Sequence, residues 1–273
     1  MKEFSTIRYE RPGTGVARIV LDRPGARNAQ NLEMTYEIDA ALQRALHDDQ
    51  VGAIVLAATD PHFSAGHDLF DVAVVGSSPQ TPRGVASGFR EPGVHGAFAR
   101  EQESYLQMVR RWRDLAKPTI AAVQGHCVAG GLMLAWACDL IYASDDAMFI
   151  DPTVAMGVCG VEWFAHPYEL GPRKAKELLF TAAQWNAQEA WRLGMVNRVI
   201  PRAELAEEVL AIAAGIAAKP RFAVQMVKAA VNRAVDLAGQ PAAIDAAFAL
   251  HHLCHADNRL VHGAPMLPKS ARL

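Results

Sequence analysis

Two glycine-containing turns carry the backbone groups that could do chemistry in this chain. One is Phe-Ser-Ala-Gly-His-Asp at residues 63–68, and the other is Gly-His-Cys-Val-Ala-Gly-Gly at residues 125–131. Each lies where a buried strand is followed by a helix, so that free N–H groups point toward an anionic or polarised ligand. If both turns lie at the same end of adjacent strands, the N–H groups of His67 and Gly130 converge on one oxygen as an oxyanion hole.

A second interpretation of these turns stays open, because glycine also permits tight turns and close packing of a helix against a strand. Other glycine-based sites do not fit the spacing. No Gly-Lys-Ser/Thr follows Gly130 and Gly131, so there is no P-loop, and the glycines miss the G-x-G-x-x-G pattern of a dinucleotide site. The chain also lacks the G-x-S-x-G turn of many serine hydrolases.

The elements that position the two turns alternate along the first part of the chain. Apolar or alternating runs predict strands at residues 16–21, 53–57, 119–123 and 139–143, with helical patterns between them. The continuous apolar run at 53–57 is typical of a strand buried on both faces of an α/β sheet. Glycine, serine and proline dominate residues 76–96, which predicts a long loop.

The last third of the chain is helical in pattern, with apolar stripes at helical spacing and Pro220 at the start of one helix. We therefore expect an α/β fold with a β/α core at residues 1–200 that holds the site. We expect residues 201–273 to form a helical region that packs against a neighbouring subunit.

The composition excludes several classes of protein. The 273 residues are 51% hydrophobic and 21% charged, with a formal net charge of −2, which is a globular mixture without the basic surface of a nucleic-acid-binding protein. No Lys/Arg run marks a membrane surface, and no apolar signal core stands at the start of the chain, so we expect a cytoplasmic location. The four cysteines form no CxxC pair and predict neither a disulfide framework nor a zinc site.

Three histidines near the C-terminal end have helical spacing. His251, His252 and His255 could share a metal ion by that spacing, but no acidic residue is spaced along the sequence to complete the site. We therefore expect a solvent-exposed or subunit-contact face there, and no metal site.

Further motifs follow in order along the chain. They include Leu-Asp-Arg-Pro at residues 21–24, Arg-Asn-Ala at 27–29, Lys-Pro-Thr-Ile-Ala-Ala-Val at 117–123, Cys-Asp-Leu-Ile-Tyr-Ala at 138–143 and Gly-Met-Val-Asn at 194–197. Together with the two glycine turns, they resemble the crotonase superfamily, also called the enoyl-CoA hydratase/isomerase family, from about residue 7 to at least residue 232.

The resemblance implies a crotonase-like spiral of ββα units with a helical C-terminal trimerisation region, assembled as a homotrimer or hexamer. It implies a coenzyme A thioester as substrate, with coenzyme A as part of that substrate and no permanently bound cofactor. The N–H groups of His67 and Gly130 would hold the thioester carbonyl. The residues implied for binding of coenzyme A or substrate are Arg23, Arg27, Ala65, Asp68, Leu69, Phe70 and Gly131. Phe70 stands where the family often has a basic residue, so the two arginines would supply the charge.

The sequence departs from the family at the catalytic positions. The two glutamates of the family's hydratases would fall on Met133, which cannot transfer a proton, and on Thr153, which is a poor base without a partner. Glu162 is the replacement we expect, because its neighbours Val161 and Trp163 are apolar and burial would raise its pKa toward neutrality. The alternative role of Glu162 is a structural salt bridge or hydrogen bond.

Asp151 is the second catalytic candidate, against a plain turn-forming Asp-Pro. The expected function is that of an enoyl-CoA hydratase/isomerase family enzyme that acts on an acyl- or enoyl-CoA thioester through an enolate. Two alternatives remain open: thioester hydrolysis or double-bond isomerisation by Glu162, and a catalytically silent subunit that only binds a CoA thioester.

Overall fold

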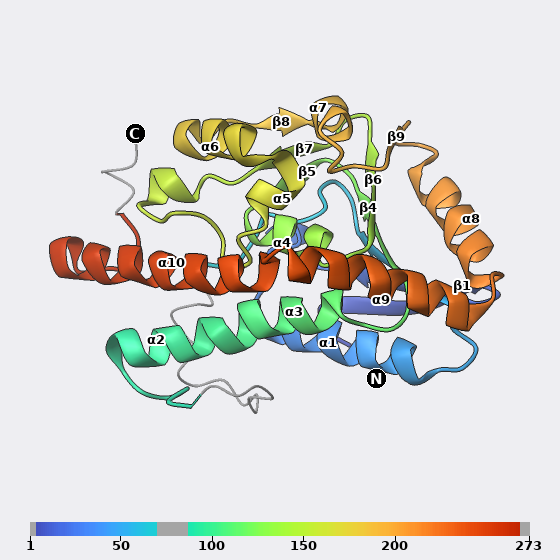
Figure 1. Cartoon of the computed structure of the whole chain (residues 1–273), viewed down its shortest axis with the longest axis horizontal. Helices are drawn as coiled ribbons and strands as arrows, with labels where there is room; N and C mark the ends of the chain where they lie inside the picture. Colours follow the sequence, from blue (N-terminus) through green and yellow to red (C-terminus); the bar gives the residue numbers. More distant parts are fainter. Residues whose placement is uncertain (1–3, 70–86, 268–273) are drawn as a thin grey trace.

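A six-stranded sheet forms the centre of the fold in the computed structural model, which describes residues 4–69 and 87–267. The strands have the order β1-β2-β3-β4-β6-β9 (Figure 1). The β1–β2 pair is antiparallel, and every other pair in this sheet is parallel. The strands are β1 Ile7–Gly13, β2 Val16–Leu21, β3 Ala53–Ala58, β4 Thr119–Val123, β6 Leu140–Ser144 and β9 Arg198–Ile200.

A second, smaller sheet lies beyond the ends of these strands. It has the order β5-β7-β8, with bounds His126–Val128, Met148–Ile150 and Trp185–Asn186. Single parallel bridges of Gln30 with His67 and of Ser64 with Cys127 continue the same pairing. The chain therefore repeats one pattern, in which a strand of the large sheet is followed by a segment of the small layer and then by a helix. This is the predicted spiral of ββα units.

The faces of β3 show why its sequence is apolar throughout. Ile54 and Leu56 belong to the main core, whereas Val55 belongs to a second cluster on the other face of the sheet. Leu205 and Val209 of α8 are part of that second cluster. A strand covered on both faces needs apolar side chains in both registers.

The helices surround the two sheets, and α9 and α10 run along one side of the molecule (Figure 1). A π-helical segment, Gln102–Gln107, joins α2 to α3 without a break. The α-helices are α1 Leu32–His47, α2 Gly93–Glu101, α3 Met108–Arg113, α4 Gly130–Trp136, α5 His166–Leu170, α6 Pro172–Thr181, α7 Ala187–Arg192, α8 Leu205–Ala217, α9 Arg221–Leu237 and α10 Gln240–His262, and short 3-10 turns occupy Pro24–Ala26 and Thr153–Met156.

The predicted loop at residues 76–96 is wrong at its end, because α2 already begins at Gly93. The high glycine content of this segment led to the prediction of a loop. Gly96 is buried, and a Cβ there would overlap the carbonyl oxygen of Glu91, so the close approach of the chain selects glycine inside a helix. Residues 70–86 of the predicted loop lie outside the described part of the chain.

The C-terminal helices differ in how they are covered. α9 has no buried residue in the isolated chain, whereas α10 buries Ile244, Phe248 and its three central histidines. Among the described residues, no single helix has both the length and the apolar character of a membrane span. The helices α8 and α9 taken together are long and apolar enough, but they are bent by 106° at their junction.

Candidate active site

The two glycine turns lie side by side. Ser64 forms a parallel bridge with Cys127, in which the N–H of Ser64 donates to His126 O at 3.1 Å and the N–H of Val128 donates to Ser64 O at 2.9 Å. His67 and Gly130 each stand three residues beyond this bridge on neighbouring segments. Within residues 4–69 and 87–267, neither of their N–H groups donates a hydrogen bond to the protein. The two turns therefore lie at the same end of adjacent strands, which is the arrangement that an oxyanion hole between them requires.

Close approach of the two backbones explains the glycine at position 66. Gly66 has φ +89°, and a Cβ there would lie 2.8 Å from Val128 O and 3.3 Å from the N of Gly130. The other turn is strained at Ala129, whose φ is +46°. Ala129 is held there because its N–H donates to Ile150 O at 2.9 Å and its carbonyl accepts the N–H of Leu132 at 2.8 Å. These contacts fix the start of α4, where Gly130 presents its N–H.

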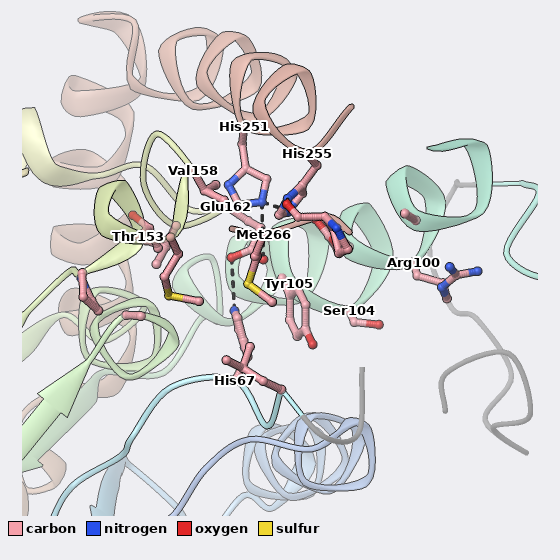
Figure 2. A pocket seen from close by; sticks show the side chains of 18 of the residues that line it. His67, Arg100, Ser104, Tyr105, Thr153, Val158, Glu162, His251, His255 and Met266 are labelled. Atoms are coloured by element: carbon pink, nitrogen blue, oxygen red, sulfur yellow. Dashed lines mark hydrogen bonds and ion pairs between the residues drawn. The ribbon is translucent and has the colours of Figure 1, made fainter. Parts of the chain in front are cut away.

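A cavity of about 660 Å³ opens beside these turns (Figure 2). Its wall is mostly apolar, and its polar side chains come from the first turn, from α2 with the π-helical segment, from the loop before α5, and from α10. The residues that line it are Leu32, Ala65, His67, Leu69, Ala97, Arg100, Glu101, Ser104, Tyr105, Val128, Ala129, Pro152, Thr153, Met156, Val158, Val161, Glu162, His251, His255, Arg259, Pro265 and Met266.

Glu162 is the carboxylate that faces the first turn. Its side chain is only 6% exposed, and its Oε2 lies 3.1 Å from Nε2 of His67. Its other oxygen, Oε1, lies 3.9 Å from Nε2 of His251 (Figure 2). The imidazole of His67 is held in place by stacking on Tyr105, with ring centroids 3.8 Å apart. The expected location of Glu162 in a substrate pocket agrees with this geometry.

The expected direction of the Glu162 pKa shift is wrong. Burial does raise the pKa of this carboxyl group, but the neighbouring imidazoles of His67 and His251 outweigh burial and leave its pKa below the ordinary value. Glu162 is therefore a carboxylate at neutral pH. It is ready to accept a proton and does not begin the reaction as a proton donor.

Asp151 does not line the cavity, so the geometry does not support the catalytic role predicted for it. Its Oδ2 lies 2.9 Å from Nε2 of His166, and both side chains are 1% exposed. It also accepts the N–H groups of Thr153 at 3.1 Å and Val161 at 3.2 Å. Burial raises the Asp151 pKa, but His166 and Thr153 together outweigh burial and lower it. Asp151 holds the loop that carries Glu162.

The two positions where the family's hydratases carry glutamates lie in different surroundings, one in the core and one on the cavity wall. Met133 is a core residue of α4 and does not line the cavity. Thr153 does line it, beside Asp151, whose carboxylate accepts the backbone N–H of Thr153 at 3.1 Å. A threonine hydroxyl is a poor base, and this carboxylate is already engaged by His166.

Only some of the residues predicted to bind coenzyme A or substrate line the cavity. Ala65 and Leu69 line the cavity, whereas Arg23 lies outside it and pairs with Asp68 at 3.0 Å. Arg27 is the left-handed residue that ends the first 3-10 turn, and it also lies outside the cavity. The remaining two predicted residues are Gly131, where a Cβ would lie 3.0 Å from Ser64 O, and Phe70, which lies outside the described residues.

The interpretation of the C-terminal histidines as a solvent or subunit-contact face is wrong. His251, His252 and His255 are buried, and each points its Nε2 at Oε2 of Glu101, at 3.4, 3.1 and 3.6 Å respectively. Burial lowers the pKa of His251, but Glu101 and Glu162 outweigh it and raise the pKa to about 9. Burial raises the Glu101 pKa, but the three imidazoles outweigh it and lower the pKa.

Glu101 and Tyr105 are site residues that the sequence reasoning missed. Both lie in the helical pattern between the strands predicted at 53–57 and 119–123, where Tyr105 is one of the residues at helical spacing. The available signal was the acidic side chain at the start of that pattern. Its partners are on α10, however, and nothing local links the two helices.

The comparisons with known proteins agree with this architecture. The family model for enoyl-CoA hydratase/isomerase matches residues 11–86 and 90–266. A probable enoyl-CoA hydratase from Rhizobium meliloti is 36% identical over 86% of this chain and 84% of its own length. A 4-chlorobenzoyl coenzyme A dehalogenase from an Arthrobacter species is 35% identical over 78% of this chain and 73% of its own length.

Solved structures extend this likeness to three dimensions. The crystal structure of a probable enoyl-CoA hydratase from Mycobacterium smegmatis superposes with a TM-score of 0.86, at 45% identity, over 96% of this chain and 99% of that one. A second, from Mycobacterium thermoresistibile, superposes with a TM-score of 0.87 at 45% identity, over the same shares of the two chains. The sequence resemblance is thereby confirmed, and the chain belongs to the enoyl-CoA hydratase/isomerase family.

Proposed function

We propose that the protein isomerises the double bond of an enoyl-CoA thioester, with Glu162 as the group that moves the proton. One observation carries this proposal: Glu162 is a buried carboxylate, kept ionised by His67 and His251, on the wall of the cavity beside the two glycine turns. The N–H groups of His67 and Gly130 would hold the thioester oxygen. Negative charge that develops there in the enolate is then stabilised by donors already in position.

The reaction needs no atom from outside the substrate. Glu162 takes a proton from one carbon next to the double bond, and the electron pair left behind moves through the conjugated system onto the thioester oxygen. The protonated Glu162 then returns the proton at the other end of the allylic system, so that the double bond moves and the carboxylate is regenerated. A single acid–base group is sufficient because it is the base in one half and the acid in the other.

The same geometry suits hydration less well than it suits isomerisation. It requires activation of a water molecule as well as protonation of the α-carbon, and the family's hydratases use two glutamates for this. Here Met133 is packed in the core, and the Thr153 hydroxyl stands beside a carboxylate, Asp151, that is already engaged by His166. These two positions support isomerisation over hydration.

The family and the shape of the cavity support a CoA thioester as the substrate. The relatives are named for enoyl-CoA or 4-chlorobenzoyl coenzyme A, which have coenzyme A in common. The cavity is lined largely by apolar side chains such as Val128, Val158 and Val161, which suit an acyl chain. Coenzyme A enters as part of the substrate, and the proposal requires no permanently bound cofactor.

We also propose a homotrimeric or hexameric assembly that covers the C-terminal helices. A helix of 17 residues with an apolar stripe and no buried residue, as α9 is here, is a helix without its partner. The exposed large apolar side chains of α9 and α10 are Phe222, Met226, Val227, Val231, Leu237, Leu250, Leu253, Leu260 and Val261.

The test is a kinetic comparison of wild type with Glu162→Gln on a panel of β,γ- and α,β-enoyl-CoA esters. We expect wild type to move the double bond and to exchange one substrate proton with D2O, followed by NMR. The Gln variant should lose about a hundred- to ten-thousand-fold in kcat, the usual contribution of a positioned acid–base group. The control Glu177→Gln changes a carboxylate that is 61% exposed and should leave kcat unchanged.

The same assay separates the alternatives. A hydroxyacyl product would assign hydration, and release of free coenzyme A would assign hydrolysis. Tight binding of the CoA ester by wild type, with neither turnover nor proton exchange, would assign a silent binding subunit. Full activity of Glu162→Gln would overturn the role of that carboxylate.

A further inference from the structure

We propose that Glu101, His251 and His255 form a binding site for one divalent transition-metal ion, of the class of Zn²⁺, on the wall of the cavity. One ligand atom from each residue lies within 4.8 Å of the other two, and all three residues line the cavity. Glu101 ends α2. The two histidines belong to α10 and point into the cavity (Figure 2). The proposal does not depend on the proposed isomerase reaction, because metal binding is measured without turnover.

Both histidines have the tautomer that a metal ligand needs. Nδ1 of His251 lies 2.7 Å from Gly160 O, and Nδ1 of His255 lies 2.6 Å from Pro265 O. A carbonyl oxygen only accepts hydrogen bonds, so Nδ1 carries the hydrogen in both rings. A metal ion that displaces the Nε2 proton would therefore find a lone pair on Nε2 of each ring. An Nδ1–H that donates to a backbone carbonyl is the usual support of a metal-binding histidine.

The two separations from Glu101 to the histidine nitrogens suit a shared metal ion, and all three ligand atoms lie within 4.8 Å of one another. Oε2 of Glu101 lies 3.4 Å from Nε2 of His251 and 3.6 Å from Nε2 of His255. Tetrahedral zinc with bonds of about 2.0–2.1 Å holds its ligands about 3.3–3.4 Å apart. Oε2 of Glu101 and Nε2 of His251 are buried and face each other as an ion pair at 3.4 Å, and neither atom makes a shorter, well-aligned hydrogen bond within the described chain.

The spacing on α10 and the kinds of atom select the class of ion. His251 and His255 are four residues apart, so they lie on one face of the helix. Two imidazole nitrogens and one carboxylate oxygen suit zinc and its neighbours in the first transition series, whereas calcium and magnesium prefer oxygen alone. Three protein ligands that face a cavity leave one coordination position open to a small molecule, as in catalytic zinc sites.

The local charge balance also favours a dication. Glu101 and Glu162 are two carboxylates with side chains only 14% and 6% exposed, and His251 lies between them at 3.4 and 3.9 Å. Arg100 and Arg259 line the same cavity, but within the described part of the chain neither forms an ion pair with these carboxylates. Buried carboxylates need nearby positive charge. In the metal-free protein His251 supplies this charge, and a divalent ion bound in place of the His251 Nε2 proton would supply it in the loaded protein.

His252 is the neighbour that competes for Glu101. Its Nε2 lies 3.1 Å from the same Oε2, but without hydrogen-bond geometry, and it falls outside the group of three mutually close ligand atoms. His252 therefore stays outside the proposed set of ligands, although its ring is as buried as theirs and lies on the same helix.

The test is zinc binding by the untagged full-length protein after removal of metals with a chelator. Isothermal titration with ZnCl₂ should give one ion per chain. Replacement of ligands in Glu101→Gln and His255→Ala should weaken binding by more than the factor of about 10 to 100 that loss of an outer-shell partner causes. The matched control is His262→Gln, which alters an exposed histidine of the same helix and should bind zinc as wild type does.

A spectroscopic measurement on wild type avoids variants that fail to fold. X-ray absorption at the zinc edge should report two imidazoles and oxygen ligands, with no sulfur. Absence of stoichiometric zinc binding, a first shell with sulfur or without imidazole, or unchanged affinity in folded Glu101→Gln and His255→Ala would each overturn the proposal. Loss of isomerase activity in Glu162→Gln with zinc binding retained would support both proposals. Full activity of Glu162→Gln with zinc binding retained would overturn only the isomerase proposal. Loss of activity in that variant without zinc binding by wild type would overturn only the zinc proposal.

Discussion

Nε2 of His67 lies 3.1 Å from Oε2 of Glu162, and the same residue carries one of the two N–H groups at the glycine turns. His67 therefore joins the two halves of the proposed site. Its backbone would stabilise the enolate oxygen, and its side chain pairs with the carboxylate proposed to move the proton and helps to keep that carboxylate ionised.

The variant His67→Ala separates these two roles because it removes the imidazole and keeps the backbone N–H. We expect kcat to fall on the order of tenfold to a hundredfold, less than the loss of the acid–base group itself, while KM changes little. Steady-state kinetics on the preferred enoyl-CoA measures both constants. The control is His47→Ala, at the exposed end of α1. An unchanged kcat in His67→Ala would show that the imidazole does not position Glu162.

The buried pair of Asp151 and His166 gives a prediction about stability. Removal of one partner from a buried ion pair costs about 3–5 kcal/mol, so Asp151→Asn should lower the free energy of unfolding by about that amount at pH 7. Both side chains are 1% exposed, so solvent screens the pair little. Urea denaturation of wild type and variant measures the difference.

The pH dependence of that difference follows from the direction of the pKa shift. The pKa of Asp151 is lower in the folded protein than in the unfolded chain, so its contribution to stability is present above the ordinary pKa of about 3.9 and is lost as the pH falls through the folded pKa. The advantage of wild type over Asp151→Asn should therefore shrink on acidification. A gap that stays constant with pH, or a loss of kcat with no loss of stability, would contradict the structural role.

Gly66 tests the geometry of the two turns. In Gly66→Ala the new Cβ would lie 2.8 Å from Val128 O and 3.3 Å from the N of Gly130, at a φ of +89°. The turns must move apart, and loss of one oxyanion donor typically costs about a hundred- to a thousand-fold in kcat. Gly215→Ala, in open space on α8, is the matched control. A kcat within a few-fold of wild type in Gly66→Ala would remove the oxyanion hole from the mechanism.

The strands and the two turns could be predicted from the sequence because local patterns determine them. Ile54 and Val55 face different clusters, so the apolar run at β3 reports burial on both faces. Gly66 marks a place where two backbones approach closely, and Gly130 marks a place where the backbone approaches the His67 ring. In both places the need for space appears in the sequence as a glycine. The side-by-side placement of His67 and Gly130 then follows from parallel pairing.

The electrostatics of the site could not be predicted in the same way. The apolar neighbours of Glu162 correctly indicated burial, but its pKa is lowered by His67 and His251, which come from distant parts of the chain. Glu101 meets His255 only because α2 and α10 lie against each other, and no local pattern encodes that contact. Sequence spacing along α10 therefore showed half of a cluster whose other half is on another helix.

The last prediction concerns the uncovered face of α9. Val231 is 58% exposed on a helix that buries none of its residues in the isolated chain, so the proposed assembly should cover it. In Val231→Asp a charge would enter an apolar contact, and burial of an unpaired charge is strongly unfavourable. Size-exclusion chromatography with light scattering should show a trimer or hexamer for wild type and a shift toward smaller species for the variant. Lys176→Asp, on the exposed side of α6, is the control and should assemble normally. A monomeric wild type, or a variant that assembles as wild type does, would contradict the assignment of α9 to the subunit contact.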